Sequence, residues 1–168
     1  LNVPSLGGVF DVRGDTLREV DATGAVLWSW SAFDHLDTHL LPGPLAQNPN
    51  QQGGFVDWTH GNGLAFDAGT DSVWLSLSHQ NHVVQISRST GDVMARFGSG
   101  GDYTLTSGAW FYSQHSPELD GPGGLLLYDN GNERPSDEVG GVLPKSERTS
   151  RAVRYVLDPS SATAVETW

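Results

Sequence analysis

The chain has 168 residues, of which 37% are hydrophobic, and it carries a formal net charge of −11 at pH 7 with no cysteine. This acidic balance argues against nucleic acid and anionic membrane as partners, because both need a basic surface that neutralises phosphates. The absence of cysteine excludes disulfides, thiolate metal sites and a cysteine nucleophile, and no run approaches the roughly 18 apolar residues of a membrane span.

The predicted elements, in chain order, are short strands separated by turns. The 21 glycines, 9 prolines and many short Val, Leu and Trp runs favour an all-β chain, and no convincing helix stands out. Blade-like repeats lie near residues 8–30, 60–97 and 115–168. Two stretches near residues 33–55 and 130–151 separate them, and we interpret both as surface insertion loops because they are rich in glycine and polar residues.

The repeats predict a β-propeller, because units of four short antiparallel strands are typical of that fold; a sandwich or an open meander fits less well. About two full blades and parts of others are recognisable, whereas a closed ring needs roughly four to eight. The chain also begins at Leu1 without a methionine or a signal peptide. We therefore predict that residues 1–168 are a partial propeller domain, a piece of a longer chain with at least one unpaired sheet edge.

The stretch from Asp57 to His82 carries the first cluster of candidate site residues. Residues 64–77 contain two runs that alternate in the strand manner around a turn signal, so they predict a hairpin. An antiparallel hairpin places its two free ends side by side. We therefore expect His60 and His79 to approach each other.

A second cluster repeats this design. The pair Gln114-His115 precedes a strand-like run at residues 124–129, much as His60 precedes the first strand of the hairpin. In a propeller the inner strands line the central channel. We therefore predict that His60, His79 and His115 face one cavity.

Several of these motifs also occur together in a known family. They are His60 with Asn62, Ser78-His79-Gln80-Asn81, Gln114-His115, Asp129-Asn130-Gly131-Asn132 with Arg134, and Ser150-Arg151-Ala152-Val153. From about Trp28 to Trp168 the chain resembles bacterial arylsulfate sulfotransferases. The resemblance implies a six-bladed propeller and an enzyme that moves a sulfuryl group from an aryl sulfate ester to a phenolic acceptor through a sulfohistidine. It implies no nucleotide donor or other cofactor, a periplasmic or extracellular location, and an isolated piece of the ring that is inactive.

The resemblance also assigns roles to individual residues. His115 corresponds to the nucleophile, while His60 and His79 are the other catalytic residues, placed around the sulfuryl group and the leaving oxygen. The expected substrate-binding residues, which offer side-chain donors, are Asn81, Arg96 and Asn62. Ser78 departs from the family pattern, in which an arginine is expected, and this indicates a diverged subgroup with another substrate.

The residue types suit this chemistry independently of the resemblance. Sulfuryl transfer, like phosphoryl transfer, has a loose transition state with charge spread over the equatorial oxygens, so positioned donors do most of the work. Imidazole has an ordinary pKa of about 6.5, so near neutrality one ring can attack and another can protonate a leaving phenolate. The expected partners are the small-molecule donor and acceptor, with a homo-oligomer left open. Trp58 and Trp110 flank the clusters and are candidates for stacking on an aryl ring.

Two other functions stay open at this point. The chain is alternatively a non-catalytic propeller that binds a partner, or a propeller hydrolase or lyase in which three histidines and Asp129 hold a metal. The sequence lacks a tight paired spacing such as His-Glu-x-x-His, so we predict no resident metal. For His35, His39 and His82 we expect ordinary structural roles.

Overall fold

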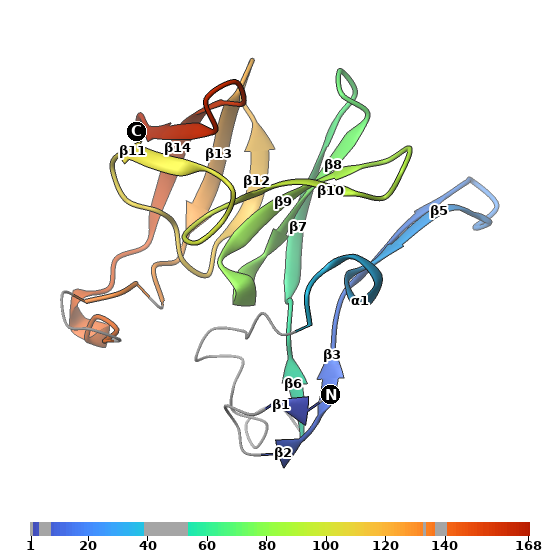
Figure 1. Ribbon diagram of the computed structural model, residues 1–168, viewed down its shortest axis with the longest axis horizontal. Helices are drawn as coiled ribbons and strands as arrows, with labels where there is room; N and C mark the ends of the chain where they lie inside the picture. The colour runs from blue at the N-terminus through green and yellow to red at the C-terminus, as the bar shows by residue number, and fades with distance from the viewer. Residues whose placement is uncertain (1, 4–7, 39–53, 133, 137–140) are drawn as a thin grey trace.

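The structure is a computed structural model that describes residues 2–3, 8–38, 54–132, 134–136 and 141–168 (Figure 1). Its strands are β1 (Asn2–Val3), β2 (Gly8–Val9), β3 (Asp11–Arg13), β4 (Thr16–Val20), β5 (Val26–Ser31), β6 (Phe55–Asp57), β7 (Gly61–Asp67), β8 (Ser72–Leu77), β9 (His82–Ser87), β10 (Val93–Phe97), β11 (Thr104–Ser107), β12 (His115–Leu119), β13 (Gly124–Asp129), β14 (Arg151–Asp158) and β15 (Thr163–Glu166). The helical turns are α1 (Ala32–His35), η3 (Ser78–Gln80) and η4 (Lys145–Glu147). The all-β prediction is confirmed, although α1 is a short helix that the sequence did not suggest.

The first large sheet has four antiparallel strands in the order β10-β9-β8-β7. Its hairpin β7–β8 is the predicted one, with Leu64 opposite Leu75. The turn forms because Asp67 accepts hydrogen bonds from the Gly69 amide at 2.8 Å and the Thr70 hydroxyl at 2.7 Å. The sequence pattern therefore fixes this hairpin through both its strands and its turn.

The second large sheet has five strands in the order β11-β15-β14-β13-β12. Strand β14 forms because Val153, Tyr155 and Leu157, which point into the core, alternate with more exposed residues. Strand β11 joins the far edge and pairs parallel with β15. In Figure 1 the two large sheets stand beside each other, with β12 and β7 on the facing edges.

Both faces of the four-stranded sheet are covered, which explains why the hydrophobic residues of β8 are largely buried. On one face Trp74 stacks on Phe97, with ring centroids 4.8 Å apart, in a core shared with Tyr155 of the second sheet and with Phe111, which precedes β12. On the other face Leu75 packs with Trp30 and Trp58 from the N-terminal segment. The β8 residues thus connect two apolar clusters, one for each face.

The two large sheets are in contact where the candidate residues lie. Asn62 on β7 donates a hydrogen bond from Nδ2 to the Gln114 carbonyl at 2.9 Å. A Cβ added to Gly63 would lie 2.8 Å from the Ser116 amide nitrogen and 2.8 Å from Cδ of Pro117, so only glycine fits there. Strands β7 and β12 are therefore in direct contact beside His60 and His115.

No sheet closes on itself among the described residues, so the prediction of an unpaired edge is confirmed. The N-terminal repeat differs from the expectation of a blade. In residues 8–30 strands β4 and β5 form a separate two-stranded sheet, and β3 pairs in parallel with β6. Of the expected insertion near residues 33–55, α1 is described, whereas residues 39–53 lie outside the described part.

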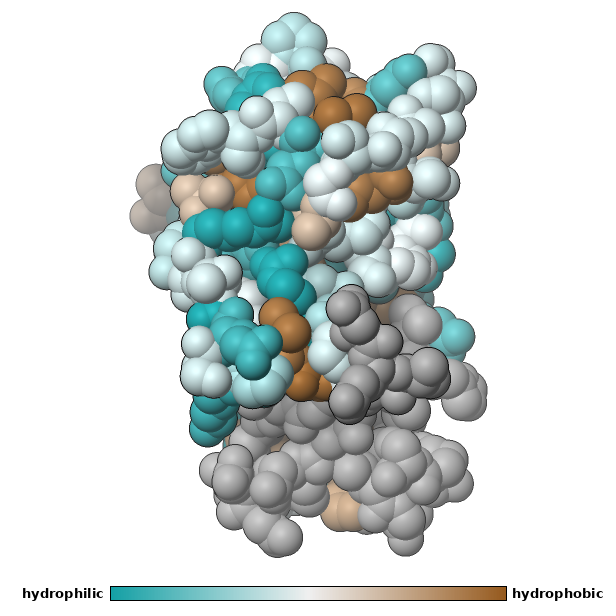
Figure 2. Space-filling view, turned by 90° about the vertical axis from the view of Figure 1, so that its left-hand side faces the viewer, coloured by the Kyte–Doolittle hydropathy of each residue, from teal (hydrophilic) through white to brown (hydrophobic). Residues whose placement is uncertain are grey.

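Exposed apolar side chains gather near the N-terminal hairpin. Leu64 and Phe66 of β7 are exposed, and a pocket of about 660 Å³ lies between them and residues Leu17 and Trp28. This pocket contains none of the predicted site residues. On the face that carries β11 and β14, Figure 2 shows hydrophilic residues separating smaller apolar patches. In the described part, no helix has the length and hydrophobicity needed to cross a membrane.

Candidate functional site

The candidate site begins with two histidine rings in contact. His60 and His79 have ring centroids 4.4 Å apart and ring planes tilted by 30°. Nδ1 of His60 lies 2.5 Å from Oδ2 of Asp57, and Nδ1 of His79 lies 2.7 Å from the backbone carbonyl oxygen of the same residue. Residue 57 therefore anchors both rings through Nδ1, and the Nε2 atoms project away from it.

The backbone around these rings is held by bonds from several segments. Asp15, in the turn between β3 and β4, accepts from the Thr59 hydroxyl at 2.5 Å and from the Gly61 amide at 2.6 Å. The Gln80 side chain donates to the Trp58 carbonyl at 2.6 Å and ties η3 to the same loop. His60 itself has φ of 50°, a conformation that is strained for a residue with a side chain.

His115 is the first residue of β12 and lies next to the segment that contacts the first sheet. Its Nδ1 lies 3.1 Å from Nδ2 of Asn130. The preceding residues are fixed by the first sheet, because the Ser113 amide donates to Oδ1 of Asn81 at 2.7 Å and Asn62 holds the Gln114 carbonyl. Asn62 and Asn81 thus link the loops that carry His60 and His79 to the start of the His115 strand.

A buried carboxylate organises the chain around His115. Asp129 is completely buried and accepts hydrogen bonds from the amides of Tyr112 and Gly131, each at 2.9 Å. It also forms ion pairs with Arg134 and with Nε of Arg151, the latter at 2.9 Å. The role of Asp129 in the structure is therefore to join residues 112–114 to the end of β13, directly before Asn130.

Arg96 lies apart from the other predicted residues. It is on β10, the edge of the sheet opposite β7, and donates to Asp102 from Nη2 at 2.7 Å and from Nε at 3.2 Å. The hydrogen bond from Arg96 lowers the pKa of Asp102 from its ordinary value, although burial opposes this. The substrate-binding role of Arg96 stays a prediction, and this arrangement gives it no support.

The two tryptophans proposed for aryl stacking belong to the core. Trp58 is 2% exposed and stacks on Phe33 with centroids 5.3 Å apart, so its faces are not available to a substrate. Trp110 packs against Tyr155 and Phe111. The stacking interpretation is therefore wrong for Trp58, and the contacts of Trp110 point to packing as well.

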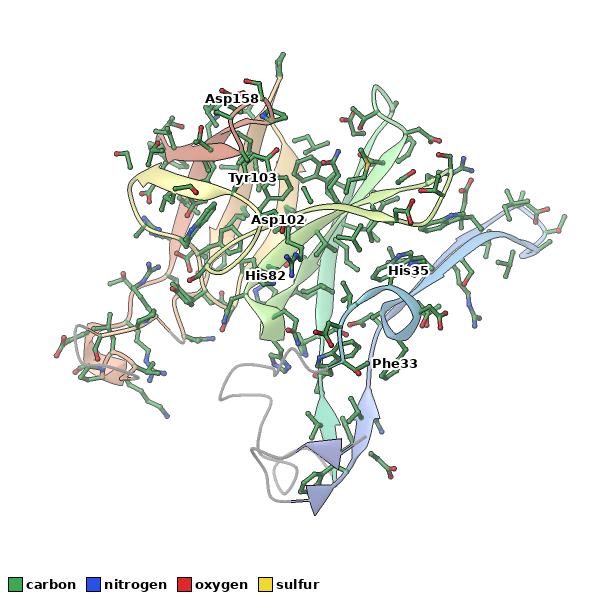
Figure 3. The ribbon with its side chains drawn as sticks, in the orientation of Figure 1. Phe33, His35, His82, Asp102, Tyr103 and Asp158 are labelled. Atoms are coloured by element: carbon green, nitrogen blue, oxygen red, sulfur yellow. The ribbon has the colours of Figure 1, made fainter. Side chains whose placement is uncertain are left out.

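The remaining described histidines have structural surroundings. His35 stacks on Trp30 with centroids 5.3 Å apart. His82 is buried and its Nε2 donates to the Ser99 carbonyl at 3.0 Å. Figure 3 shows His82 beside Asp102 and well separated from His35. His39 lies outside the described residues.

We expect His82 to make the stability of the protein depend on pH. Burial lowers the pKa of its imidazole from the ordinary value of 6.5, with a smaller opposite contribution from the Ser99 carbonyl. The unfolded chain therefore takes up this proton first as pH falls, and stability present above about pH 6.5 is lost as pH falls through the folded-state pKa. Urea unfolding at about pH 7.5 and about pH 5.5 should show a larger loss in the native protein than in His82→Gln. Equal losses in the two proteins would contradict this.

Sequence reasoning missed two residues of the site, Asp57 and Asp15. Asp57 stood at the start of the central stretch and received no role, although its spacing of three before His60 was visible. Asp15 gave no signal, because the long-range contact that brings it to Thr59 depends on the packing of the N-terminal segment.

These features define an all-β protein in which two contacting imidazoles and a third histidine are held around the junction of two sheets, an arrangement suited to group transfer and proton transfer. The chain belongs to the arylsulfotransferase (ASST) family, whose model matches residues 4–168. A comparison with curated proteins finds no match. Family membership indicates a sulfotransferase acting on small-molecule substrates.

Proposed function

We propose that the intact protein transfers a sulfuryl group from an aryl sulfate ester to a phenolic acceptor through a sulfohistidine at His115. The observation that carries the proposal is the arrangement of the contacting pair His60 and His79 beside the start of the strand that carries His115. Two hydrogen bonds link the histidine pair to that strand: Asn62 donates to the Gln114 carbonyl, and the Ser113 amide donates to Asn81.

In the first step the lone pair on Nε2 of His115 forms a bond to sulfur as the bond from sulfur to the aryl oxygen breaks. The departing oxygen takes the electron pair and receives a proton from the imidazolium form of His60 or His79. Proton transfer of this kind contributes roughly 10²- to 10⁴-fold to a rate. The contact between the two rings lets either Nε2 serve the same oxygen.

In the second step the acceptor phenol gives its proton to the imidazole that was deprotonated in the first step. Its oxygen then attacks sulfur, and the bond from sulfur to Nε2 of His115 breaks and returns the electron pair to the ring. The cycle restores both histidines, so it needs no cofactor. Oδ1 of Asn81 accepts a hydrogen bond from the Ser113 amide, which leaves Nδ2 as a donor. We assign this Nδ2 the role of donating a hydrogen bond to a sulfuryl oxygen.

The described part also supports the proposal that this chain is a piece of a β-propeller. The four-stranded sheet and the five-stranded sheet stand side by side. Strand β7 of one contacts β12 of the other, as the inner strands of neighbouring propeller blades contact each other. We propose a six-bladed ring that works in the periplasm or outside the cell, a location that follows from the resemblance alone.

Turnover of a chromogenic aryl sulfate by the intact protein tests the function. With a phenol added, we expect steady release of the chromogenic phenol and appearance of the sulfated acceptor. Without an acceptor, we expect a burst of about one equivalent, the mark of a covalent intermediate. Binding of aryl sulfate without release would favour a non-catalytic module and contradict the proposal.

Asn130 gives a prediction about the tautomer of His115. Attack through Nε2 requires the proton on Nδ1, and Asn130 can accept it when its amide presents Oδ1, since amide oxygen and nitrogen exchange places by rotation. We expect Asn130→Leu to slow the burst by roughly ten- to a hundredfold, the effect of losing a hydrogen bond of about 1.5–3 kcal/mol. Asn130→Asp keeps an acceptor and should retain most of the rate. Equal slowing in both variants would assign Asn130 a purely structural role.

A further inference from the structure

The pair His60 and His79, together with Asp57, has the arrangement of a metal-binding group. One ligand atom from each of the three side chains lies within 4.8 Å of the others. The residues come from different elements, since Asp57 ends β6, His60 precedes β7 and His79 lies in η3. The fold therefore brings the loop between β6 and β7, which carries Asp57 and His60, against η3, which carries His79.

The orientation of the rings is the strongest observation. Histidines that bind a metal through one nitrogen usually donate the other N–H to a carboxylate or a backbone carbonyl. His60 meets the Asp57 carboxylate and His79 meets the Asp57 carbonyl in this way, both through Nδ1. Neither Nε2 has a hydrogen-bond partner among the described residues, so each is available as a ligand atom.

The surroundings allow a cation to reach these atoms. The side chains of His60, Asp57 and His79 are 44%, 25% and 12% exposed, so the group opens to solvent while one ring is largely buried. The His60 ring lies against that of His79, and its Nδ1 lies 2.5 Å from the Asp57 carboxylate, which fixes the orientation of the ring. The protein as a whole carries a net charge of −11, which raises the local concentration of cations.

We propose that His60 and His79 bind a divalent cation of the zinc class through their Nε2 atoms, with the Asp57 carboxylate orienting His60 from behind. Imidazole ligands select zinc and its neighbours among the transition metals over magnesium or calcium, which prefer oxygen ligands. Water completes the coordination. Two protein ligands make the binding reversible, so this is a site for an exchangeable ion.

Binding of this ion would inhibit the proposed sulfuryl transfer, and this consequence rests on the proposed function. The metal takes the same Nε2 lone pairs that carry the proton to and from the phenolic oxygen. An occupied site therefore cannot protonate the leaving group. Zinc should lower turnover in proportion to its occupancy, and a chelator should restore it.

Calorimetric titration of ZnCl2 into the chelator-treated intact protein tests the binding without any aryl sulfate. We expect one equivalent of zinc per chain, with no displacement by a large excess of magnesium. His60→Gln and His79→Gln should each weaken binding at least about tenfold, and Asp57→Asn should weaken it by roughly 10- to 100-fold, the usual effect of losing an orienting partner. Cobalt in place of zinc should give a visible absorption spectrum that the two histidine variants lose.

The control is His35→Gln, which removes an imidazole that stacks on Trp30 away from the site and should leave zinc affinity unchanged. The proposal is overturned if wild-type protein gives no binding heat, or if the double variant His60→Gln/His79→Gln binds zinc as tightly as wild type. Binding without inhibition of turnover would overturn the inhibitory role alone. Zinc binding by a protein that never releases phenol from an aryl sulfate would sink the sulfotransferase proposal and leave the metal site standing.

Discussion

His115→Ala is expected to abolish the burst of phenol release and the covalent labelling of the protein by aryl sulfate. The reason is that the variant lacks the nitrogen that would form the bond to sulfur, and the described part has no cysteine that could replace it. The measurement is a single-turnover reaction of the intact protein with an aryl sulfate, followed by peptide mass spectrometry. Wild-type protein should carry the sulfuryl group on His115.

His60→Ala and His79→Ala are the matched comparisons for this prediction. Each removes an imidazole from the same site, and each should slow both steps by roughly 10²- to 10⁴-fold without moving the label from His115. A burst of normal size in His115→Ala would contradict the assignment of the nucleophile. So would a label on His60 or His79 in wild-type protein that still turns over.

The local parts of the fold were predictable because neighbouring residues determine them. The hairpin β7–β8 follows from alternation and from the turn that Asp67 closes, and it placed His60 beside His79. The alternation in β14 likewise indicates which side chains enter the core. In each case the residues that form the sequence pattern and the contacts that they predict lie within one strand or two adjacent strands.

The parts that sequence reasoning missed depend on contacts between distant segments. The parallel pairing of β3 with β6, and the bond from Thr59 to Asp15, arise from the packing of the N-terminal segment against the first sheet. No local pattern near Asp15 marks it as a partner of Thr59. For Arg96 the sequence suggests a substrate ligand, and that role stays a prediction; the structure adds an ion pair with Asp102, six residues later, which the sequence did not indicate.

The resemblance identified the family but said little about the residues that surround His115. The motif from Asp129 to Asn132 has residues typical of a turn. In the structure its first residue is a buried charge with two arginine partners, and its second contacts His115. A motif typical of a turn can therefore carry a residue, here Asp129, whose hydrogen bonds and ion pairs join the segments around His115.

Asp129→Asn is expected to lower the free energy of unfolding by about 3 to 5 kcal/mol, the usual cost of removing one partner from a buried ion pair. Asp129 is completely buried, and its loss of charge leaves Arg134 and Arg151 without their shared carboxylate. Urea unfolding of the intact protein measures the change.

The matched control for this prediction is Asp120→Asn. Asp120 pairs with Arg154 at 2.6 Å, but its side chain is 57% exposed, so water screens the charges and the cost should be about 0 to 1 kcal/mol. Both substitutions remove one negative charge that pairs with arginine, but Asp129 is buried with two arginine partners, whereas Asp120 is exposed with one. Similar losses in the two variants would show that net charge, and not the buried network at Asp129, controls the result. A large loss confined to Asp129→Asn would instead mean that the link between residues 112–114 and the end of β13 stabilises the junction on which His115 stands.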